Sequence, residues 1–436
     1  MLVEDAAKSG ANARNRVLWL VVTALLYAAL TWPVILSGIT GPGGPARDET
    51  NYHLPVLRQF LSQWPHPELG DYPSALAPGY YLFLAGIGQT LGDGLHFFRL
   101  VTGLFALGSV LLLQAFVPSR VSAAHAFVIA LPLMALPITL RSGMWLLTDF
   151  PAFFLITLGL GLAMTSAGKI RQLAAAAIAI FCAIYFRQIS AWAIAPVAVA
   201  VLQSRDNLKL RIALMVMLVL LPAAILVKFH QLWGGLTPPA FQTRYQRPNP
   251  AAIMMVLSYL GIVTPFFIAA SPSLVRRVRW NSPAVVACAT VGLIASVAWP
   301  TAYNLTEGRS GGPLWSIAQR LPSLAGRSIM FPPLAIMGAV GLFALWNGAR
   351  SQRPRATMLV VALVAMMAAH ATIHEAYERY YQPPIMLLCA WLFSLAADEK
   401  DESRMGILPI AVLAAGFFAL SFVTEYYTLF RPHPLD

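Results

Sequence analysis

Apolar runs of close to twenty residues recur along the whole chain, and they limit its possible folds more than any other feature. A helix rises about 1.5 Å per residue, so a run of this length crosses the roughly 30 Å of hydrocarbon in a bilayer. Of the 436 residues, 58% are apolar and 11% are charged, whereas a soluble domain has about 25% charged residues. A soluble fold cannot hide so much apolar surface. The sequence therefore predicts an all-α polytopic integral membrane protein.

The predicted spans form a single membrane domain over residues 1–436, with about 12–13 transmembrane helices. The runs are 17–37, 95–116, 122–140, 150–167, 172–187, 188–203, 211–230, 251–271, 283–301, 328–346, 357–374, 382–397 and 406–424. Residues 172–203 are compatible with one long helix or with two short ones. The segment 78–91 is apolar but short and contains Pro78 and several glycines. It is predicted to be an interfacial or re-entrant helix, because a full span needs about 20 residues.

Lysine and arginine cluster in every second predicted loop, at 120, 169–171, 205–211, 276–279, 350–355 and 400–404. These residues accumulate in the cytoplasmic loops of membrane proteins. The alternation predicts an N-terminus inside, and it accounts for the net charge of +12 without a nucleic-acid partner. The first run, 17–37, is longer than the apolar core of a signal peptide and lacks an A-x-A cleavage site. It is predicted to be an uncleaved anchor.

Three long loops then lie on the outer face of the membrane, at 38–94, 231–250 and 302–327. Long polar loops on one face are where binding and chemistry usually occur. Within the first loop, residues 49–64 carry Tyr, Val, Phe and Trp at every fourth position. This spacing predicts an amphipathic helix that lies on the membrane surface.

Two carboxylates, Asp48 and Glu49, begin this amphipathic segment. One interpretation is that they cap a helix N-terminus, where the helix dipole favours negative charge. The other is that one of them is a general base that takes the proton from a sugar hydroxyl. His53 lies four residues beyond Glu49 and would either hold the carboxylate or simply pack.

Polar residues also adjoin two later runs. Asp149, in Thr-Asp-Phe-Pro, fits a helix start and equally fits a carboxylate that faces a cavity. Arg187 and Gln188 interrupt an otherwise apolar stretch. An arginine there either snorkels to the interface or binds a phosphate that lies at the interface, because its fork is bidentate and always charged.

The last polar cluster contains His370, His374, Arg379 and Tyr380. Two histidines four residues apart share a helix face and could ligate zinc, but the sequence lacks the H-E-x-x-H pattern and an evident third ligand. No metal is therefore predicted. Arg379, between aromatic residues, suits an interfacial anchor or a phosphate contact. The three cysteines lie in apolar runs without metal spacing, at Cys182, Cys288 and Cys389.

Several of these motifs resemble a known family. Arg-Asp-Glu-x-x-x-His-Leu-Pro at 47–55, Trp64, Ala-Pro-Gly-Tyr-Tyr-Leu at 77–82 and Phe-Arg-Leu-Val at 98–101 follow the order seen in the dolichyl-phosphoglucose α-1,2-glucosyltransferases of the endoplasmic reticulum. That family also has an aspartate, a Phe-Arg-Gln and an Asn-Arg-His-Tyr-like stretch further on. In this sequence, Asp149, Phe186-Arg187-Gln188 and Glu378-Arg379-Tyr380-Tyr381 stand in those places.

The resemblance implies the GT-C architecture and an inverting glycosyltransferase without metal or cofactor. The donor would be a polyprenyl-phosphate sugar, glucose favoured, and the acceptor a glycan or a lipid-linked saccharide. The richness in Ala and Arg suggests a bacterial relative in the inner membrane with its site facing the periplasm, or facing the endoplasmic reticulum lumen in a eukaryote. The implied roles are general base for Asp48 or Glu49, donor phosphate binding for Arg187, Gln188 and Arg379, and secondary site residues for Asp149, His53, His374 and Tyr380.

The chemistry fits these residue types. A sugar on a single lipid phosphate leaves as a phosphate monoester, whose two negative charges arginines stabilise directly. A nucleotide-sugar enzyme would use a metal for its diphosphate, and the outer loops contain no D-x-D motif. Two other classes stay open: a lipid-linked glycan polymerase, flippase or transporter, and a non-catalytic scaffold. A transporter should show inverted repeats with matching halves, which the sequence does not show.

Overall fold

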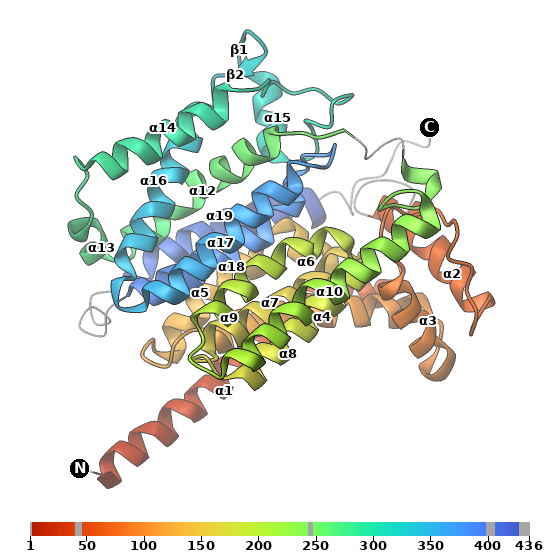
Figure 1. Cartoon of the computed structure of the whole chain (residues 1–436), viewed down its shortest axis with the longest axis horizontal. Helices are drawn as coiled ribbons and strands as arrows, with labels where there is room; N and C mark the ends of the chain where they lie inside the picture. The colour runs from red at the N-terminus through yellow and green to blue at the C-terminus, as the bar shows by residue number, and fades with distance from the viewer. Residues whose placement is uncertain (1, 40–45, 243–246, 398–405, 427–436) are drawn as a thin grey trace.

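The computed structural model describes residues 2–39, 46–242, 247–397 and 406–426 of the chain, and these residues are mostly helical (Figure 1). The helices of the first half are α1 (Leu2–Ser37), η2 (Glu49–His53), α2 (Leu54–Ser62), α3 (Gly79–Leu91), α4 (Leu95–Phe116), α5 (Ala123–Ala135), α6 (Pro137–Met144), α7 (Asp149–Thr165), α8 (Ile170–Phe186), η3 (Gln188–Ala193), α9 (Ile194–Gln203) and α10 (Leu208–Trp233). The second half contains η4 (Pro239–Phe241), α12 (Ala251–Ala269), α13 (Pro272–Arg277), α14 (Pro283–Val297), α15 (Pro313–Arg320), α16 (Phe331–Gly348), η5 (Arg350–Gln352), α17 (Arg353–His370), η6 (Glu378–Tyr380), α18 (Gln382–Ala396), α19 (Leu408–Ser421) and η8 (Phe422–Tyr426). The strands β1 (Ser323–Leu324) and β2 (Arg327–Ser328) form a short antiparallel hairpin.

Among the described residues, six helical segments are long and apolar enough to cross a membrane. They are Arg14–Ser37 of α1, Leu95–Phe116, Leu208–Trp233, Ala251–Ala269, Phe331–Gly348 and Leu408–Tyr426. The prediction of a helical membrane protein with several spans is confirmed to this extent. Each of the other predicted runs also contains a helix, but these helices are shorter or less apolar. The count of 12–13 spans stays a prediction.

One predicted run is broken in the middle, and one open alternative is decided. The run 122–140 divides at Leu136 into α5 and α6, whose axes differ by 74°. Leu136 precedes Pro137, and the proline ring pushes the preceding residue out of the helical region; Leu136 has ψ 138°. Residues 172–203, for which the sequence allowed one long helix or two short ones, form separate helices, because the backbone at Arg187 is extended, with φ −155° and ψ 106°. The segment 78–91 forms the short helix α3, as predicted.

The basic loops lie together at one end of the bundle, which we call the short-loop end. Arg16 of α1 donates hydrogen bonds to the carbonyls of Val117, Pro118 and Val121, and Arg120 donates to the carbonyls that end α18. Further along the chain, the amide of Gly406 donates to Ala270 O. Gln203 also donates to Pro354 O and Ser204 to Gly168 O, so the described loops agree with the grouping that the basic clusters predicted; the cluster at 400–404 lies outside the described residues.

The three long loops meet at the opposite end, which we call the long-loop end. The indole of Trp233, which ends α10, donates to Leu69 O at 2.7 Å. The side chain of Asn249 donates to Glu307 O and to His374 O, at 3.0 and 2.7 Å. Loops far apart in the sequence thus contact one another at this end, near α2 and α15 in Figure 1. The basic charge of the other end predicts that the long-loop end faces away from the cytoplasm.

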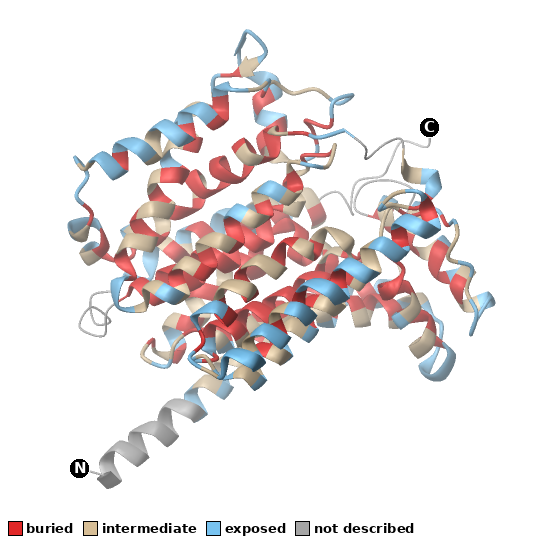
Figure 2. Ribbon diagram, viewed as in Figure 1, coloured by how far each residue is buried: buried red, intermediate tan, exposed pale blue. Residues whose placement is uncertain are grey.

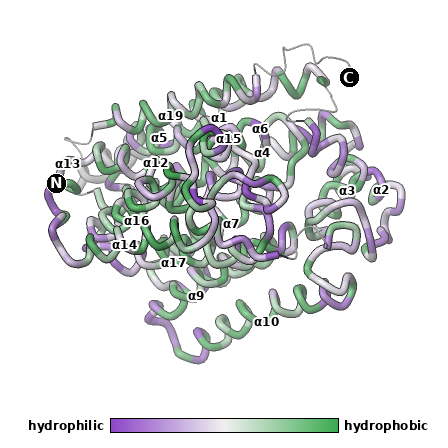
Figure 3. The backbone as a smooth tube through the Cα atoms, turned by 90° about the horizontal axis from the view of Figure 1, so that it is seen from above, coloured by the Kyte–Doolittle hydropathy of each residue, from purple (hydrophilic) through white to green (hydrophobic). Residues whose placement is uncertain are grey.

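The core runs along the middle of the bundle, where the buried residues of Figure 2 concentrate. The closest helix pair, α12 and α16, depends on two glycines. A Cβ on Gly338 would lie 1.8 Å from Leu257 O, and one on Gly261 would lie 2.0 Å from Leu334 O. Small residues allow this approach, as is common between helices in membranes. By contrast, α10 lies along the outside of the bundle in Figure 3, and its apolar face suits contact with lipid.

Candidate functional site

A cavity of about 950 Å³ opens at the long-loop end. Its wall is built from the first long loop, the α6–α7 connection, α15, the segment between α17 and α18, and the end of α19 with η8. Small-molecule sites in proteins occupy roughly 300–1,000 Å³. The cavity is therefore large enough for two substrates at once. Of the sequence-predicted site residues, it is lined by Asp48, His53, Asp149, Arg187, Arg379 and Tyr380.

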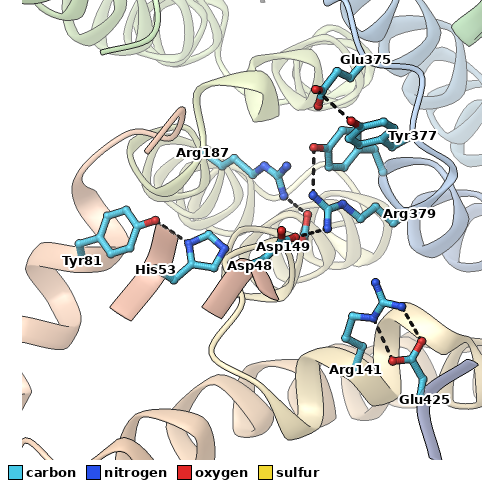
Figure 4. Close-up of polar contacts among 11 residues, drawn as sticks. Asp48, His53, Tyr81, Arg141, Asp149, Arg187, Glu375, Tyr377, Arg379 and Glu425 are labelled. Carbon is cyan, nitrogen blue, oxygen red and sulfur yellow. Dashed lines mark hydrogen bonds and ion pairs between the residues drawn. The ribbon is translucent and has the colours of Figure 1, made fainter. Parts of the chain in front are cut away.

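Two ion pairs lie side by side in this cavity (Figure 4). Asp48 accepts a hydrogen bond from Arg379, and Asp149 accepts one from Arg187. Both guanidinium groups lie over the ring of Tyr380, at 4.9 Å for Arg187 and 5.3 Å for Arg379. Tyr380 therefore holds the two arginines toward the same point through cation–π contacts.

Burial alone would raise the pKa of Asp48, but the Arg379 guanidinium outweighs this effect and holds the pKa of Asp48 below its ordinary value. Asp48 is therefore ionised at neutral pH. A general base must be ionised before it can take a proton, so this charge state suits that role. The Asp48 side chain keeps 28% of its surface exposed, which leaves it accessible to a ligand in the cavity.

Both arginines also carry a buried donor without a partner. The Nε atoms of Arg187 and Arg379 make no hydrogen bond within the described part of the chain. The same holds for Nδ1 of His370 and the hydroxyl of Tyr381, whose rings pack against each other at 5.1 Å. An unmade hydrogen bond on a buried polar group is costly. Arg187, Arg379 and His370 line the same small cavity, where a ligand with oxygen acceptors would satisfy these groups.

A second, smaller cavity of about 50 Å³ adjoins the first and shares Asp149, Arg187, Arg379 and Tyr380 with it. Apart from His370, its remaining wall is mainly apolar, and it is formed by Phe150, Ala152, Phe153, Ile156, Ile189, Ser190, Trp192, Pro383 and Pro384. The arginines thus lie at a boundary between a large polar cavity and a small apolar one. An amphiphile with a charged head would place that head at this boundary.

His53 is buried beside the ion pairs and shares a hydrogen bond of 2.7 Å, through Nδ1, with the hydroxyl of Tyr81. The Tyr81 hydroxyl in turn contacts Ser74 Oγ at 3.0 Å. Burial lowers the pKa of His53 to about 4, so the imidazole is neutral at pH 7. Its polar contact with Tyr81 fixes the side of the cavity next to Asp48.

Glu49, the alternative base, lies elsewhere. It is buried and accepts hydrogen bonds from Arg99 at 2.9 and 2.5 Å, and from the amide of Leu146 at 2.7 Å. Glu49 does not line either cavity. Neighbouring helical residues point about 100° apart, so when Asp48 faces the cavity Glu49 faces the protein interior. The geometry supports Asp48 in the role of base and gives Glu49 a structural one.

Gln188 and His374 also lie outside both cavities. The amide of Gln188 donates to Ala75 O and Leu236 O and accepts from the amide of Ala77, so it joins two long loops. Its predicted contact with the donor phosphate is not supported by this placement. His374 accepts from Asn249 through its carbonyl oxygen. In the ranges that the structure describes, no cluster of three or more His, Cys, Asp or Glu could hold a metal.

The cavity also contains an ion pair that the sequence did not reveal. Arg141 of α6 donates to both carboxylate oxygens of Glu425, at 2.9 and 2.7 Å, and Glu425 is buried. Arg141 interrupts the apolar stretch around residue 140, which was the available signal for it. Glu425 gave no such signal, because it lies near the chain end beside polar residues.

Glu378 lines the cavity and connects parts of its wall through hydrogen bonds. It accepts from the hydroxyl of Tyr259 and from the amide of Trp315, the latter at 2.7 Å. Burial raises the pKa of Glu378 to about 7. The backbone of Gly312 passes over this carboxylate, and a Cβ there would lie 2.3 Å from it.

No protein family model, no curated protein and no solved structure matches this chain. The GT-C architecture and the enzymatic activity that the motifs suggested therefore stay proposals, and the site has to be interpreted from its own geometry.

Proposed function

We propose that the chain is a membrane glycosyltransferase that moves a hexose, glucose favoured, from a polyprenyl phosphate to a saccharide acceptor. One observation carries the proposal. Arg187 and Arg379 converge on Tyr380, each with an unpartnered Nε–H, at the boundary between a polar and an apolar cavity. Two carboxylates, those of Asp149 and Asp48, pair with these two arginines.

The boundary fits the donor lipid. A polyprenyl phosphate has an apolar tail and a phosphate at headgroup level, and arginine binds phosphate oxygens with a bidentate fork. The small apolar cavity below the arginines would receive the first part of the isoprenoid chain. The sugar would then extend into the large cavity, toward Asp48.

The proposed reaction is a single displacement with inversion at the anomeric carbon. Asp48 takes the proton of the acceptor hydroxyl as the new carbon–oxygen bond forms. The bond from the anomeric carbon to the phosphate oxygen breaks, and its electron pair stays on the phosphate. The leaving polyprenyl phosphate gains a second negative charge, which Arg187 and Arg379 stabilise where it develops.

The donor phosphate would also free the base. In the structure Asp48 is paired with Arg379, and in this pair the carboxylate is not free to accept a proton. A phosphate that binds both arginines competes with Asp48 and Asp149 for them. The base is then released only when a donor is bound.

Incubation of the purified protein in liposomes with radiolabelled polyprenyl-phosphate glucose, mannose and galactose, together with methyl glycosides as saccharide acceptors, tests the proposal. We expect cleavage of at least one donor, and its loss in Asp48→Asn. Asp93→Asn is the matched control, because Asp93 is exposed at the same end of the molecule and lines neither cavity. Absence of cleavage of every donor, or full activity of Asp48→Asn, would overturn the proposal.

A further inference from the structure

Two aromatic rings from different long loops form one wall of the large cavity. Tyr52 belongs to η2 and Phe241 ends η4. Their centroids lie 5.9 Å apart, and their planes meet at 74°, the edge-to-face arrangement that aromatic pairs prefer. Both residues line the cavity and both are half-buried. We call this pair the Tyr52–Phe241 platform.

The platform is held in place by contacts between the two loops. The amide of Gln188 donates to Ala75 O in the first loop and to Leu236 O in the second, at 2.8 and 2.9 Å. Next to Phe241, the amide of Ala240 donates to Asp71 at 3.3 Å. These bonds explain why Phe241 lies against Tyr52 although 189 residues separate them, from 52 to 241.

The platform adjoins the proposed base. Tyr52 follows Asp48 by four residues in a helical segment, so both side chains project from the same face, about one turn apart. Both line the same cavity. A molecule that offers a hydroxyl to Asp48 would therefore lay its body on the Tyr52–Phe241 platform.

We propose that the Tyr52–Phe241 platform is the acceptor subsite, and that it binds the pyranose ring that carries the accepting hydroxyl. This inference rests on the proposed function, because it uses Asp48 as the base. A pyranose has an apolar face of C–H groups and a polar edge of hydroxyls. The aromatic rings cover the face, and the polar side chains of Arg47, Asp48 and Ser74, which line the same cavity, meet the edge.

The chemistry of the wall selects a sugar over a lipid chain. An isoprenoid chain needs apolar side chains around it. The small cavity beside Arg187 provides apolar side chains over most of its wall. The platform has charged neighbours. An isoprenoid bound there would leave these neighbours without hydrogen bonds, which costs free energy. In an inverting displacement the acceptor attacks opposite the leaving phosphate, so the acceptor belongs beside Asp48 and the donor phosphate beside Arg187.

Saturation-transfer NMR on the full chain in phosphatidylcholine nanodiscs tests the inference. The probes are the methyl glycosides of glucose, mannose, galactose and N-acetylglucosamine, without donor. We expect at least one glycoside to bind, with transfer strongest to the C–H protons of one ring face. Tyr52→Leu and Phe241→Leu should each weaken this binding about two- to tenfold, the range of an aromatic contact. Tyr52→Phe should bind as the wild type does.

Trp64→Leu is the control for an aromatic residue that only anchors the loop to the membrane. Trp64 is exposed in the same loop and does not line the cavity, so this variant should bind as the wild type does. The inference is overturned if no glycoside binds the wild type, or if Tyr52→Leu binds as tightly. Titration of donor lipid in the same nanodiscs separates the two proposals: a wild type that binds no polyprenyl-phosphate sugar sinks the proposed function, whereas unchanged glycoside binding in Tyr52→Leu sinks only the platform.

Discussion

Asp48 and Arg379 form an ion pair across 331 residues of sequence, and the pair joins the first long loop to the segment before α18. Both side chains are about one quarter exposed, at 28% and 27%. The pair is therefore accessible from the cavity and can be opened by a ligand. A fully buried pair would resist such an exchange, because separating it leaves an unpaired charge in the interior.

Removal of the proposed base should stop transfer without weakening donor binding. We expect Asp48→Asn to lower the transfer rate by about 10²–10⁴-fold, as is typical for a general base. Because asparagine competes less for Arg379, the donor should bind at least as tightly as to the wild type. Transfer assays and titration with donor lipid measure the two effects. Weaker donor binding together with slow transfer would instead indicate structural damage.

Arg187 should contribute directly to donor affinity. A hydrogen bond to a charged group contributes roughly 1.5–3 kcal/mol, so Arg187→Ala should raise the apparent donor Kd about ten- to hundredfold. Arg187→Lys should recover only part of this, since an ammonium replaces a bidentate fork. An arginine that merely snorkels to the interface would tolerate lysine fully. Equal donor affinities of the three proteins would contradict the assignment.

The buried Glu49–Arg99 pair should matter for stability. Arg99 and Glu49 have 0% and 1% of their side-chain surface exposed. Glu49→Gln leaves the Arg99 charge poorly compensated, and we expect a loss of about 3–5 kcal/mol. Thermal unfolding in nanodiscs measures the loss. The double variant Glu49→Gln/Arg99→Met should regain part of the lost stability. The neighbouring Asp48→Asn should lower stability much less. Equal losses of stability in Glu49→Gln and Asp48→Asn would contradict the distinction between the two carboxylates.

Glu378 should make stability depend on pH. Burial raises the pKa of Glu378 to about 7, above its ordinary value of 4.5. Between these values the folded protein binds more protons than the unfolded one, so stability falls as the pH rises from about 4.5 to 7. One pKa unit corresponds to about 1.4 kcal/mol, which bounds the loss at about 3 kcal/mol. Melting curves across this window should show a slope in the wild type that Glu378→Gln removes; parallel curves would contradict the prediction.

The orientation of the bundle in the membrane can be measured by cysteine labelling. The basic clusters predict that the short-loop end faces the cytoplasm and the long-loop end faces away from it. A membrane-impermeant maleimide added from outside should therefore label Gly70→Cys and leave Asn207→Cys unlabelled. Labelling at 207, or none at 70, would reverse the orientation. The three native cysteines lie in helices and should be replaced first.

Much of the candidate site could be predicted, because charged residues beside apolar runs are costly and need a reason. Asp149 and Arg187 were recognisable in this way, and the structure pairs them. Arg379 and Tyr380 were recognisable from their aromatic surroundings. The sequence could not show that Asp48 pairs with Arg379, since pairing depends on how distant helices pack.

The choice between Asp48 and Glu49 was beyond the sequence for the same reason. Both are acidic, adjacent and near a helix start, and only the position of Arg99 shows which of them is buried in a salt bridge. Gln188 was predicted to bind the donor phosphate because a polar residue beside an arginine suggests a shared ligand, and this stays a prediction. Its actual partners are backbone atoms of two loops, which carry no side-chain signature. The break at Leu136 was not predicted although Pro137 signals it, and the break at Arg187 falls at the boundary between the two short helices that the sequence allowed.

The separation between Asp48 and Arg379 has a consequence for biogenesis. A ribosome adds about 5–20 residues per second, so roughly 15–65 s pass between the synthesis of these two partners. Arg99 is made only 50 residues after Glu49, so the fold of the first long loop can be stabilised early, before the rest of the chain emerges. The Asp149–Arg187 and Asp48–Arg379 pairs of the cavity come later, and the Arg141–Glu425 pair closes last, once η8 has been made. A nascent chain arrested before residue 379 would have a folded first loop and an open, incomplete site.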